Sequence, residues 1–280
     1  MQLIMHSYTF RSYSLREAFV NAKRFGWDGI ELQPCHFDSG KLDVELPAAV
    51  ELGREYGVAI RCVDSGGDFI NDDSRVVEKE VARMERDIEA CARCGVVLIN
   101  GGVGRLAVDT TDYGKNGSAL AKDVHYERAA NAMKHLGALA AKSGITIVFE
   151  IHMNMLTDTI NSTSRLLDLI GLDNVRANPD CGNMYATSTA EKDPEELERL
   201  RGRIGYYHFK NCRADRGAYD FSVRLADGHI DVYKWLEKIA GMGYDGPMCV
   251  EYCGAGDPRV AAEADLAYMR RSLEWIRAAG

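Results

Sequence analysis

A phrase of helix-like residues, one glycine and a short apolar run recurs along this chain and limits its fold more than any other feature. It reads REYGVAIRC, CARCGVVLIN, AAKSGITIVFE and KIAGMGYDGPMCVE, with a looser copy in AKRFGWDGIEL. Glycine is favoured just past a helix C-terminus, where φ turns positive. The runs that follow are rich in Val, Ile and Leu, as expected for parallel strands covered on both faces. The chain therefore predicts helices that alternate with parallel strands.

Applied to the whole chain, this pattern predicts eight strands, near residues 2–7, 29–33, 58–63, 96–100, 145–151, 174–179, 204–210 and 247–252. Eight helices are predicted between them, near 14–25, 45–56, 74–94, 124–142, 160–170, 193–201, 230–240 and 258–278. Eight such pairs favour a closed (β/α)8 TIM barrel over an open doubly wound sheet of roughly six strands. Since no Pro-, Ser- or Gly-rich tract divides the chain, we expect a single α/β domain over residues 1–280.

Charge and composition argue against several classes of function. The 280 residues carry a net charge of −8 and contain no Lys- or Arg-rich run, whereas nucleic-acid binding depends on neutralising phosphates. The first residues lack a basic region followed by a long apolar core, and no apolar stretch approaches the roughly 20 residues that span a bilayer. We therefore expect a cytoplasmic protein with a small-molecule partner, no nucleic acid and no membrane. The sequence leaves a homo-oligomer open.

The segment ITIVFEIHMN, residues 145–154, contains a strand that ends in two polar residues. The run is apolar apart from Thr146 until it reaches Glu150, and His152 follows on the same face of the strand because side chains alternate. Burying a charged group without a partner costs roughly several kcal/mol or more. A cation or a substrate at this end of the strand would supply the partner.

Three later strands end in the same way. Asp180 and Asn183 follow the sixth predicted strand, His208 and Lys210 lie at the end of the seventh, and Glu251 ends the eighth. The C-terminal ends of barrel strands converge on one face, where barrel enzymes hold their active sites. Carboxylates and one imidazole suit a divalent ion such as Mn²⁺, Mg²⁺, Co²⁺ or Zn²⁺. The sequence therefore predicts a metal site at Glu150, Asp180, His208 and Glu251.

Two further residues are candidates for substrate contact. His6 ends the first predicted strand and is expected to face the same pocket. Arg213, with Arg216 as the alternative, follows the seventh strand and is the cation best placed to meet an anionic or polyol substrate. Two long connections, 64–73 and 101–123, would lie at the same barrel end and are candidates for lids or substrate walls.

The strand-end motifs FEIHMN, NPDCGN, YHFKN and VEYCG, together with GWDGIEL and DGHID, resemble those of one family. They are similar to the xylose isomerase-like TIM barrels, the sugar phosphate isomerase/epimerase superfamily. That group also includes tagatose-type ketose epimerases, hydroxypyruvate isomerase, inosose dehydratase and the more distant endonuclease IV. The resemblance spans the whole chain, and it is specific for the superfamily rather than for one reaction.

The resemblance implies one divalent metal ion, expected first as Mn²⁺, bound by Glu150, Asp180, His208 and Glu251. Glu150 and Glu251 would also form the acid/base pair on opposite faces of the substrate. His152, Asn183 and Lys210 match the Glu-x-His, Asp-x-Gly-Asn and His-x-Lys forms of one branch, and would contact substrate. Asn183 stands where ketose epimerases usually carry His, so the resemblance to the tagatose-type epimerases is incomplete.

The resemblance implies an isomerase or epimerase that acts on a small sugar, keto-sugar or hydroxy-keto acid through a metal-stabilised enediolate. The alternative is a lyase with the same metal site: a decarboxylase of a β-keto sugar acid, a keto-polyol dehydratase or a keto-glycoside lyase. DNA repair of the endonuclease IV type is disfavoured by the acidic charge balance and by the few spare histidines. A non-catalytic sugar-binding module would not need two glutamates at a metal. Spacing alone does not identify the substrate.

Overall fold

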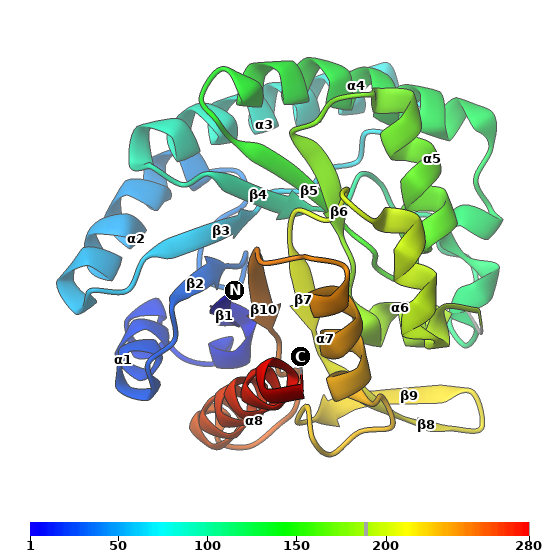
Figure 1. Ribbon diagram of the computed structural model, residues 1–280. Coiled ribbons are helices and arrows are strands. Elements are labelled where there is room, and N and C mark those ends of the chain that lie inside the picture. The colour runs from blue at the N-terminus through cyan, green and yellow to red at the C-terminus, as the bar shows by residue number, and fades with distance from the viewer. Residues whose placement is uncertain (188–189, 280) are drawn as a thin grey trace.

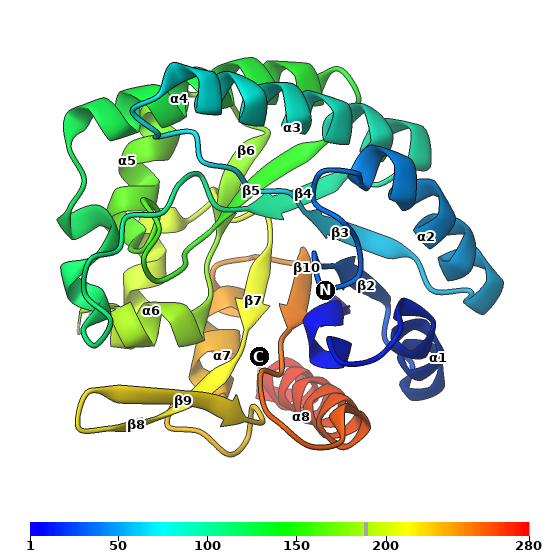
Figure 2. The same ribbon diagram turned by 180° about the vertical axis from the view of Figure 1, so that it is seen from behind.

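Eight parallel strands form a barrel with helices on its outside in the computed structural model, which describes residues 1–187 and 190–279 (Figures 1 and 2). The strands are β1 (Gln2–His6), β2 (Gly29–Leu32), β3 (Ile60–Asp64), β4 (Leu98–Gly101), β5 (Thr146–Glu150), β6 (Val175–Asn178), β7 (Tyr207–Phe209) and β10 (Pro247–Val250). Their order in the sheet is β6-β5-β4-β3-β2-β1-β10-β7. The barrel and all eight predicted strands are confirmed.

Two isolated parallel bridges join the two end strands of this sheet. Ala177 pairs with Ile204, and Asp180 pairs with His208. The backbone N–H of His208 donates to the carbonyl oxygen of Pro179 at 2.9 Å. The barrel is therefore closed between the β6 and β7 segments, and two of the predicted metal ligands lie side by side at that seam.

The helices are α1 (Leu15–Phe25), α2 (Leu42–Tyr56), α3 (Ser74–Cys94), α4 (Asp123–Ala141), α5 (Ile160–Ile170), α6 (Cys181–Thr187), α7 (Val232–Gly241) and α8 (Pro258–Ala279). Short 3-10 turns lie at η1 (Ser7–Phe10), η2 (Tyr113–Lys115), η3 (Gly117–Ala119), η4 (Ala190–Lys192) and η5 (Pro194–Leu200). Gly57 and Gly95 end α2 and α3 with positive φ, as the recurring phrase predicted. Among the residues described, no helix combines the length and apolar character that crossing a bilayer requires.

Three local features differ from the sequence-based prediction. The helix expected at 193–201 is the 3-10 turn η5, and the short helix α6, which begins directly after Asp180, was not predicted. An antiparallel hairpin, β8 (Asn211–Asp215) and β9 (Ala218–Val223), follows β7 and projects beside the barrel (Figure 2). Its turn residues Arg216 and Gly217 both have positive φ, the geometry of a two-residue hairpin turn. Polar and apolar residues alternate along both strands, but these short segments lack the near-continuous apolar runs by which the other strands were recognised, so the hairpin was not predicted.

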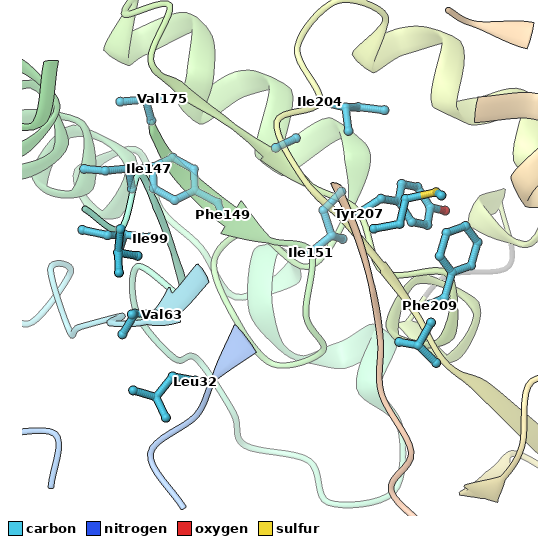
Figure 3. Close-up of a cluster of buried hydrophobic side chains, with 14 of the residues drawn as sticks. Leu32, Val63, Ile99, Ile147, Phe149, Ile151, Val175, Ile204, Tyr207 and Phe209 are labelled. Carbon is cyan, nitrogen blue, oxygen red and sulfur yellow. The ribbon is translucent and has the colours of Figure 1, made fainter. Parts of the chain in front are cut away.

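Apolar side chains fill two regions on either side of the barrel wall. The larger core lies between the strands and the helices, and Figure 3 shows part of it around Ile99, Ile147 and Phe149. A separate cluster consists of Ile4, Cys62, Leu98, Val148, Tyr206 and Cys249, which come from six strands or their N-terminal flanks. Two positions further along the same strands stand polar residues: His6, Asp64, Asn100, Glu150, His208 and Glu251. Because side chains alternate along a strand, the apolar cluster lies beneath a polar layer at the C-terminal end of the barrel.

Candidate active site

A cavity of about 710 Å³ opens at the C-terminal end of the barrel. Five of the predicted site residues line it: His6, Glu150, His152, Lys210 and Glu251. The long connections supply other walls, including Asp68 from 64–73 and Arg105 and Tyr113 from 101–123. Both connections therefore contribute to the cavity, as expected for the loops at this face of a barrel.

Three predicted metal ligands form a tight cluster. One donor atom each from Glu150, Asp180 and His208 lies within 4.8 Å of the other two. His208 Nδ1 is 3.5 Å from Glu150 Oε1. Within the part of the chain that the structure describes, His208 Nδ1 and Asp180 Oδ2 are buried without a hydrogen-bond partner. Buried polar atoms nearly always have a hydrogen bond, so two donor atoms without one, beside a second carboxylate, fit a divalent cation.

Asn183 holds two of these ligands in place. Its backbone N–H donates to Asp180 Oδ1 at 2.9 Å, and its side-chain Nδ2 donates to Glu150 Oε1 at 2.9 Å. Asn183 lies in α6, the helix that begins at Cys181, and it is completely buried. The structure thus places Asn183 against the carboxylates and outside the cavity lining, whereas the family resemblance implied a contact with substrate.

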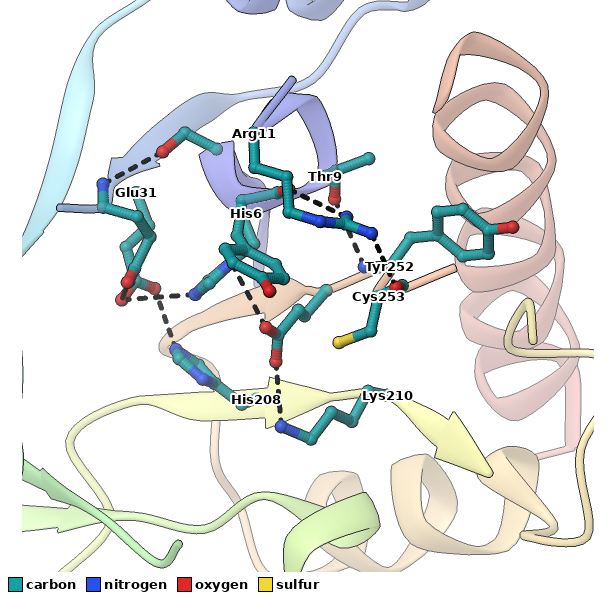
Figure 4. A network of polar contacts seen from close by, with 12 residues as sticks. His6, Thr9, Arg11, Glu31, His208, Lys210, Tyr252 and Cys253 are labelled. Atoms are coloured by element: carbon teal, nitrogen blue, oxygen red, sulfur yellow. Dashed lines mark hydrogen bonds and ion pairs between the residues drawn. The ribbon is translucent and has the colours of Figure 1, made fainter. Parts of the chain in front are cut away.

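Glu251 faces the cavity from the other side of the seam and pairs with Lys210. Lys210 Nζ is 2.9 Å from Glu251 Oε2 and 3.5 Å from Asp180 Oδ2. His6 Nδ1 lies 3.7 Å from Glu251 Oε1. Figure 4 shows His6 and Lys210 on this network. Glu251 is therefore held by nitrogen groups and is not part of the three-residue cluster.

Burial and neighbouring cationic groups together determine the pKa values of the three carboxylates. Burial alone would raise the pKa of Glu150, but His208 outweighs it and holds that pKa well below its ordinary value. Burial would likewise raise the pKa of Glu251, but Lys210 and His6 bring it to about 2. Burial raises the pKa of Asp180 above its ordinary value, with Lys210 opposing. Glu150 and Glu251 are therefore both ionised at neutral pH, which a proton acceptor and an ion ligand require.

Glu31 is a site residue that the sequence-based prediction did not name. It lies at the C-terminal end of β2, is completely buried, and its Oε2 is 2.8 Å from His208 Nε2. Asn100 Nδ2 donates to Glu31 Oε1 at 3.1 Å. Asp64, which lines the cavity, was also missed, and burial beside Glu31 raises its pKa to about 8. Each is a polar residue near the end of an apolar strand, the same signal that identified Glu150.

The structure places His152 at the cavity and Arg213 away from it. His152 lines the cavity, and its Nδ1 donates to the carbonyl oxygen of Met153 at 2.9 Å, which leaves Nε2 as the acceptor of the neutral ring. The structure does not bring Arg213 to this cavity. It is exposed on the hairpin, where its Nε donates to the carbonyl oxygen of Asp227 at 3.3 Å, and it lines a separate depression. Arg105 is an arginine that does line the cavity.

Known sequences similar to this chain include epimerases and dehydratases. A probable ketose 3-epimerase from Synechocystis sp. is 26% identical over 258 residues, which cover 89% of this chain and 82% of that protein. An inosose dehydratase from Lacticaseibacillus casei is 31% identical over 144 residues, which cover 46% of this chain and 47% of that protein. The second match therefore spans about half of each chain.

Solved structures share the fold over nearly the whole length. An L-ribulose 3-epimerase superposes with a TM-score of 0.78 at 19% identity, covering 99% of this chain and 96% of that one. The IolI protein with a bound zinc atom gives a TM-score of 0.75 at 15% identity, covering 99% of this chain and 98% of that one.

The barrel with its cluster defines a class, the α/β barrels with carboxylates and an imidazole gathered at the C-terminal face. Residues 19–279 match the model of the xylose isomerase-like TIM barrels, and the chain belongs to that family. The resemblance seen in the strand-end motifs is thereby confirmed. The chain is an enzyme, as predicted, in a family whose members similar to it are epimerases and dehydratases.

Proposed function

We propose that the protein is a divalent-metal-dependent isomerase or epimerase that moves a proton on carbon next to the carbonyl of a small sugar, keto-sugar or hydroxy-keto acid. The observation that carries this proposal is the cluster of Glu150, which lines the cavity, with the buried residues Asp180 and His208. Two of its donor atoms are buried without hydrogen bonds among the described residues. Mn²⁺ is the ion proposed first, and Mg²⁺, Co²⁺ and Zn²⁺ are the alternatives.

Glu150, Asp180 and His208 would hold the ion, and Glu251 is the fourth proposed ligand. The carboxylate of Glu251 is held by the amine of Lys210 and lies near His6, and a divalent ion can replace the charge that these groups supply. When bound, the ion would act as a Lewis acid that makes the C–H beside a substrate carbonyl more acidic.

The chain's own residues would perform the proton transfer. Glu150 is ionised, lines the cavity and is oriented by Asn183, so it can accept a proton from carbon. Glu251 lines the same cavity from β10, which is separated from β5 by β6 and β7 around the closed barrel. A carboxylate on each side of the substrate can remove a proton from one face and return it to the other. His152 Nε2 and Lys210 are proposed to bind substrate oxygens.

The alternative is a lyase, and the pairing of Lys210 with Glu251 favours it. If Lys210 keeps the carboxylate of Glu251 engaged during turnover, Glu150 remains the one free base, which suffices for loss of water, of CO₂ or of a glycosyl group. The inosose dehydratase that matches half of the chain is a lyase by name, and the probable ketose 3-epimerase that matches most of it is an isomerase.

The experiment that tests the proposal combines metal content with turnover. The protein is depleted of metal with EDTA, reloaded with Mn²⁺, Mg²⁺, Co²⁺ or Zn²⁺, and incubated with a panel of ketoses and keto-acids. We expect about one ion per chain and activity that disappears and returns with the ion. A changed ratio of substrate isomers identifies the isomerase or epimerase reaction. A dehydrated product or released CO₂ identifies the lyase reaction. Full activity in a metal-free preparation would refute the proposal.

A further inference from the structure

A chain of buried amides and one carboxylate lies beneath the proposed metal site and ends on His208. Asn178 Nδ2 donates to Asn100 Oδ1 at 2.9 Å, and Asn100 Nδ2 donates to Glu31 Oε1 at 3.1 Å. Gln33 Nε2 donates to the same oxygen at 2.8 Å. Glu31 Oε2 is 2.8 Å from His208 Nε2 (Figure 4). Four of the five residues are completely buried, and Gln33 is 9% exposed.

We infer that Glu31 is a positioning residue that fixes the ring nitrogen with which His208 binds the metal. This inference rests on the proposed function, because it assumes an ion at the cluster of Glu150, Asp180 and His208. An ionised carboxylate can only accept hydrogen bonds, so Nε2 of His208 carries the proton that Glu31 accepts. Nδ1, 3.5 Å from Glu150 Oε1, is then the atom that is free to bind a cation.

The amides around Glu31 explain why the residue must be a carboxylate. Gln33 and Asn100 both point N–H groups at Oε1, and Asn100 cannot turn its amide over without losing the bond from Asn178. A glutamine at position 31 would therefore keep its oxygen toward these donors and turn its NH₂ toward His208. Two N–H groups would then face each other, unless the proton of His208 moved to Nδ1. In either case the ring loses the arrangement that binds metal.

The same residues offer a competing role, a second metal site. Donor atoms of His6, Glu31 and His208 also lie within 4.8 Å of one another. Both oxygens of Glu31 are already engaged, however, Oε1 by two amide donors and Oε2 by His208. A cation there would have to displace the proton on Nε2 and compete with both amides. The hydrogen-bond arrangement therefore favours the orienting role, and metal stoichiometry distinguishes the two.

The first test measures Zn²⁺ affinity by competition with a chromophoric chelator for the wild-type chain and for Glu31→Gln. Loss of a residue that orients a ligating imidazole typically weakens metal binding about 10- to 100-fold, and we expect a loss in that range. Glu31→Asp, which keeps the charge but shortens the side chain, should retain part of the Zn²⁺ affinity that Glu31→Gln loses. Asp265→Asn is the matched control, because Asp265 is also a buried carboxylate and accepts a hydrogen bond from the backbone N–H of Leu225 in another part of the protein. Its Zn²⁺ affinity should equal that of the wild type.

The second test needs no variant. In Zn²⁺-loaded wild-type protein labelled with ¹⁵N-histidine, the ring of His208 should show a proton on Nε2 and metal on Nδ1, with one Zn²⁺ per chain. Equal affinities of wild type and Glu31→Gln, metal on Nε2, or a second tightly bound ion would each overturn the inference while leaving the proposed function intact. A wild-type chain that binds no divalent ion would overturn both.

Discussion

Asp180 and His208 pair across the seam that closes the barrel, so the backbone contact that completes the fold also brings two proposed metal ligands together. Asp180 follows β6 and His208 lies in β7, and only isolated bridges join these two segments, whereas β4, β5 and β6 are joined by continuous ladders. A cation bound by both side chains would therefore also hold the two edges of the sheet together. Metal binding and barrel stability should be coupled.

The first prediction follows from this coupling. A ligand that binds only the folded state stabilises it by about 2.7 kcal/mol at a concentration 100 times its dissociation constant. Adding Mn²⁺ or Zn²⁺ to metal-free protein should therefore raise the Tm by several degrees, and excess EDTA should reverse the change. Asp180→Ala should abolish the metal-dependent rise. A Tm that is the same with and without metal in the wild type would contradict the coupling.

The second prediction separates Glu150 from its neighbour His152. Glu150→Gln removes the proposed base, so kcat should fall about 10²-fold or more, the usual contribution of a positioned general base. His152→Ala should chiefly raise KM and leave metal content unchanged, because His152 lies outside the three-residue cluster and bonds to Met153. Steady-state kinetics and elemental analysis of both variants check this. A loss of metal in His152→Ala would assign it to the metal instead.

The sequence predicted the barrel well because the signals were local and repeated. Apolar runs after glycine mark five of the eight strands, and the polar residues Glu150, His208 and Glu251 stand at the ends of apolar runs. Strand alternation then fixes which side chains point inward, so their convergence follows from the closed sheet alone.

Other parts of the site depend on contacts that spacing does not contain. Asn183 was expected on substrate, but α6 turns directly after Asp180 and buries it against two carboxylates. Arg213 lies on a hairpin whose short alternating strands lack the continuous apolar runs of the barrel strands, and the hairpin carries it away from the cavity. Glu31 could have been found, because it is a charged residue in an apolar strand, but its partner His208 is distant in sequence.

The third prediction uses the two arginines as a matched pair. Arg105 lines the cavity and Arg213 does not. If substrate oxygens reach the cavity wall, Arg105→Ala should raise KM roughly tenfold with little change in kcat, the loss of about one charge-assisted hydrogen bond. Arg213→Ala should leave both constants unchanged. The reverse result would restore the original expectation for Arg213.

The fourth prediction concerns pH and stability at Asp265, away from the active site. Burial raises the pKa of Asp265 to about 7 from an ordinary 3.8, so the folded state favours the protonated acid. Its contribution to stability is complete below pH 3.8 and is lost as the pH rises through about 7. The loss is at most about 4 kcal/mol, from about 1.4 kcal/mol per pKa unit. Asp265→Asn cannot ionise, so its unfolding free energy should fall less than that of the wild type between pH 5 and pH 8. Urea unfolding at both pH values measures the free energy of unfolding. An equal change in the two proteins between these pH values would refute the raised pKa of Asp265.

The last prediction concerns Glu251 and decides between the two proposed reactions. An epimerase needs a carboxylate on each face of the substrate, so Glu251→Gln should lower kcat about as strongly as Glu150→Gln, by roughly 10²-fold. A lyase with one base needs only Glu150, and Glu251→Gln should then cause a much smaller loss while Lys210 loses its nearest partner. Lys210→Met is the companion variant, because it frees Glu251 without removing it.

Turnover in D₂O supplies an independent measurement for the same choice. Epimerisation by two carboxylates should introduce solvent deuterium at the inverted carbon of the product, because the second glutamate exchanges its proton with water. The wild type and Glu251→Gln are compared by mass spectrometry of product and recovered substrate. Deuterium in the wild-type product, together with its loss in Glu251→Gln, supports the two-base epimerase. Equal incorporation in both proteins with nearly equal kcat would show that Glu251 is not needed to return the proton and would refute the two-base mechanism.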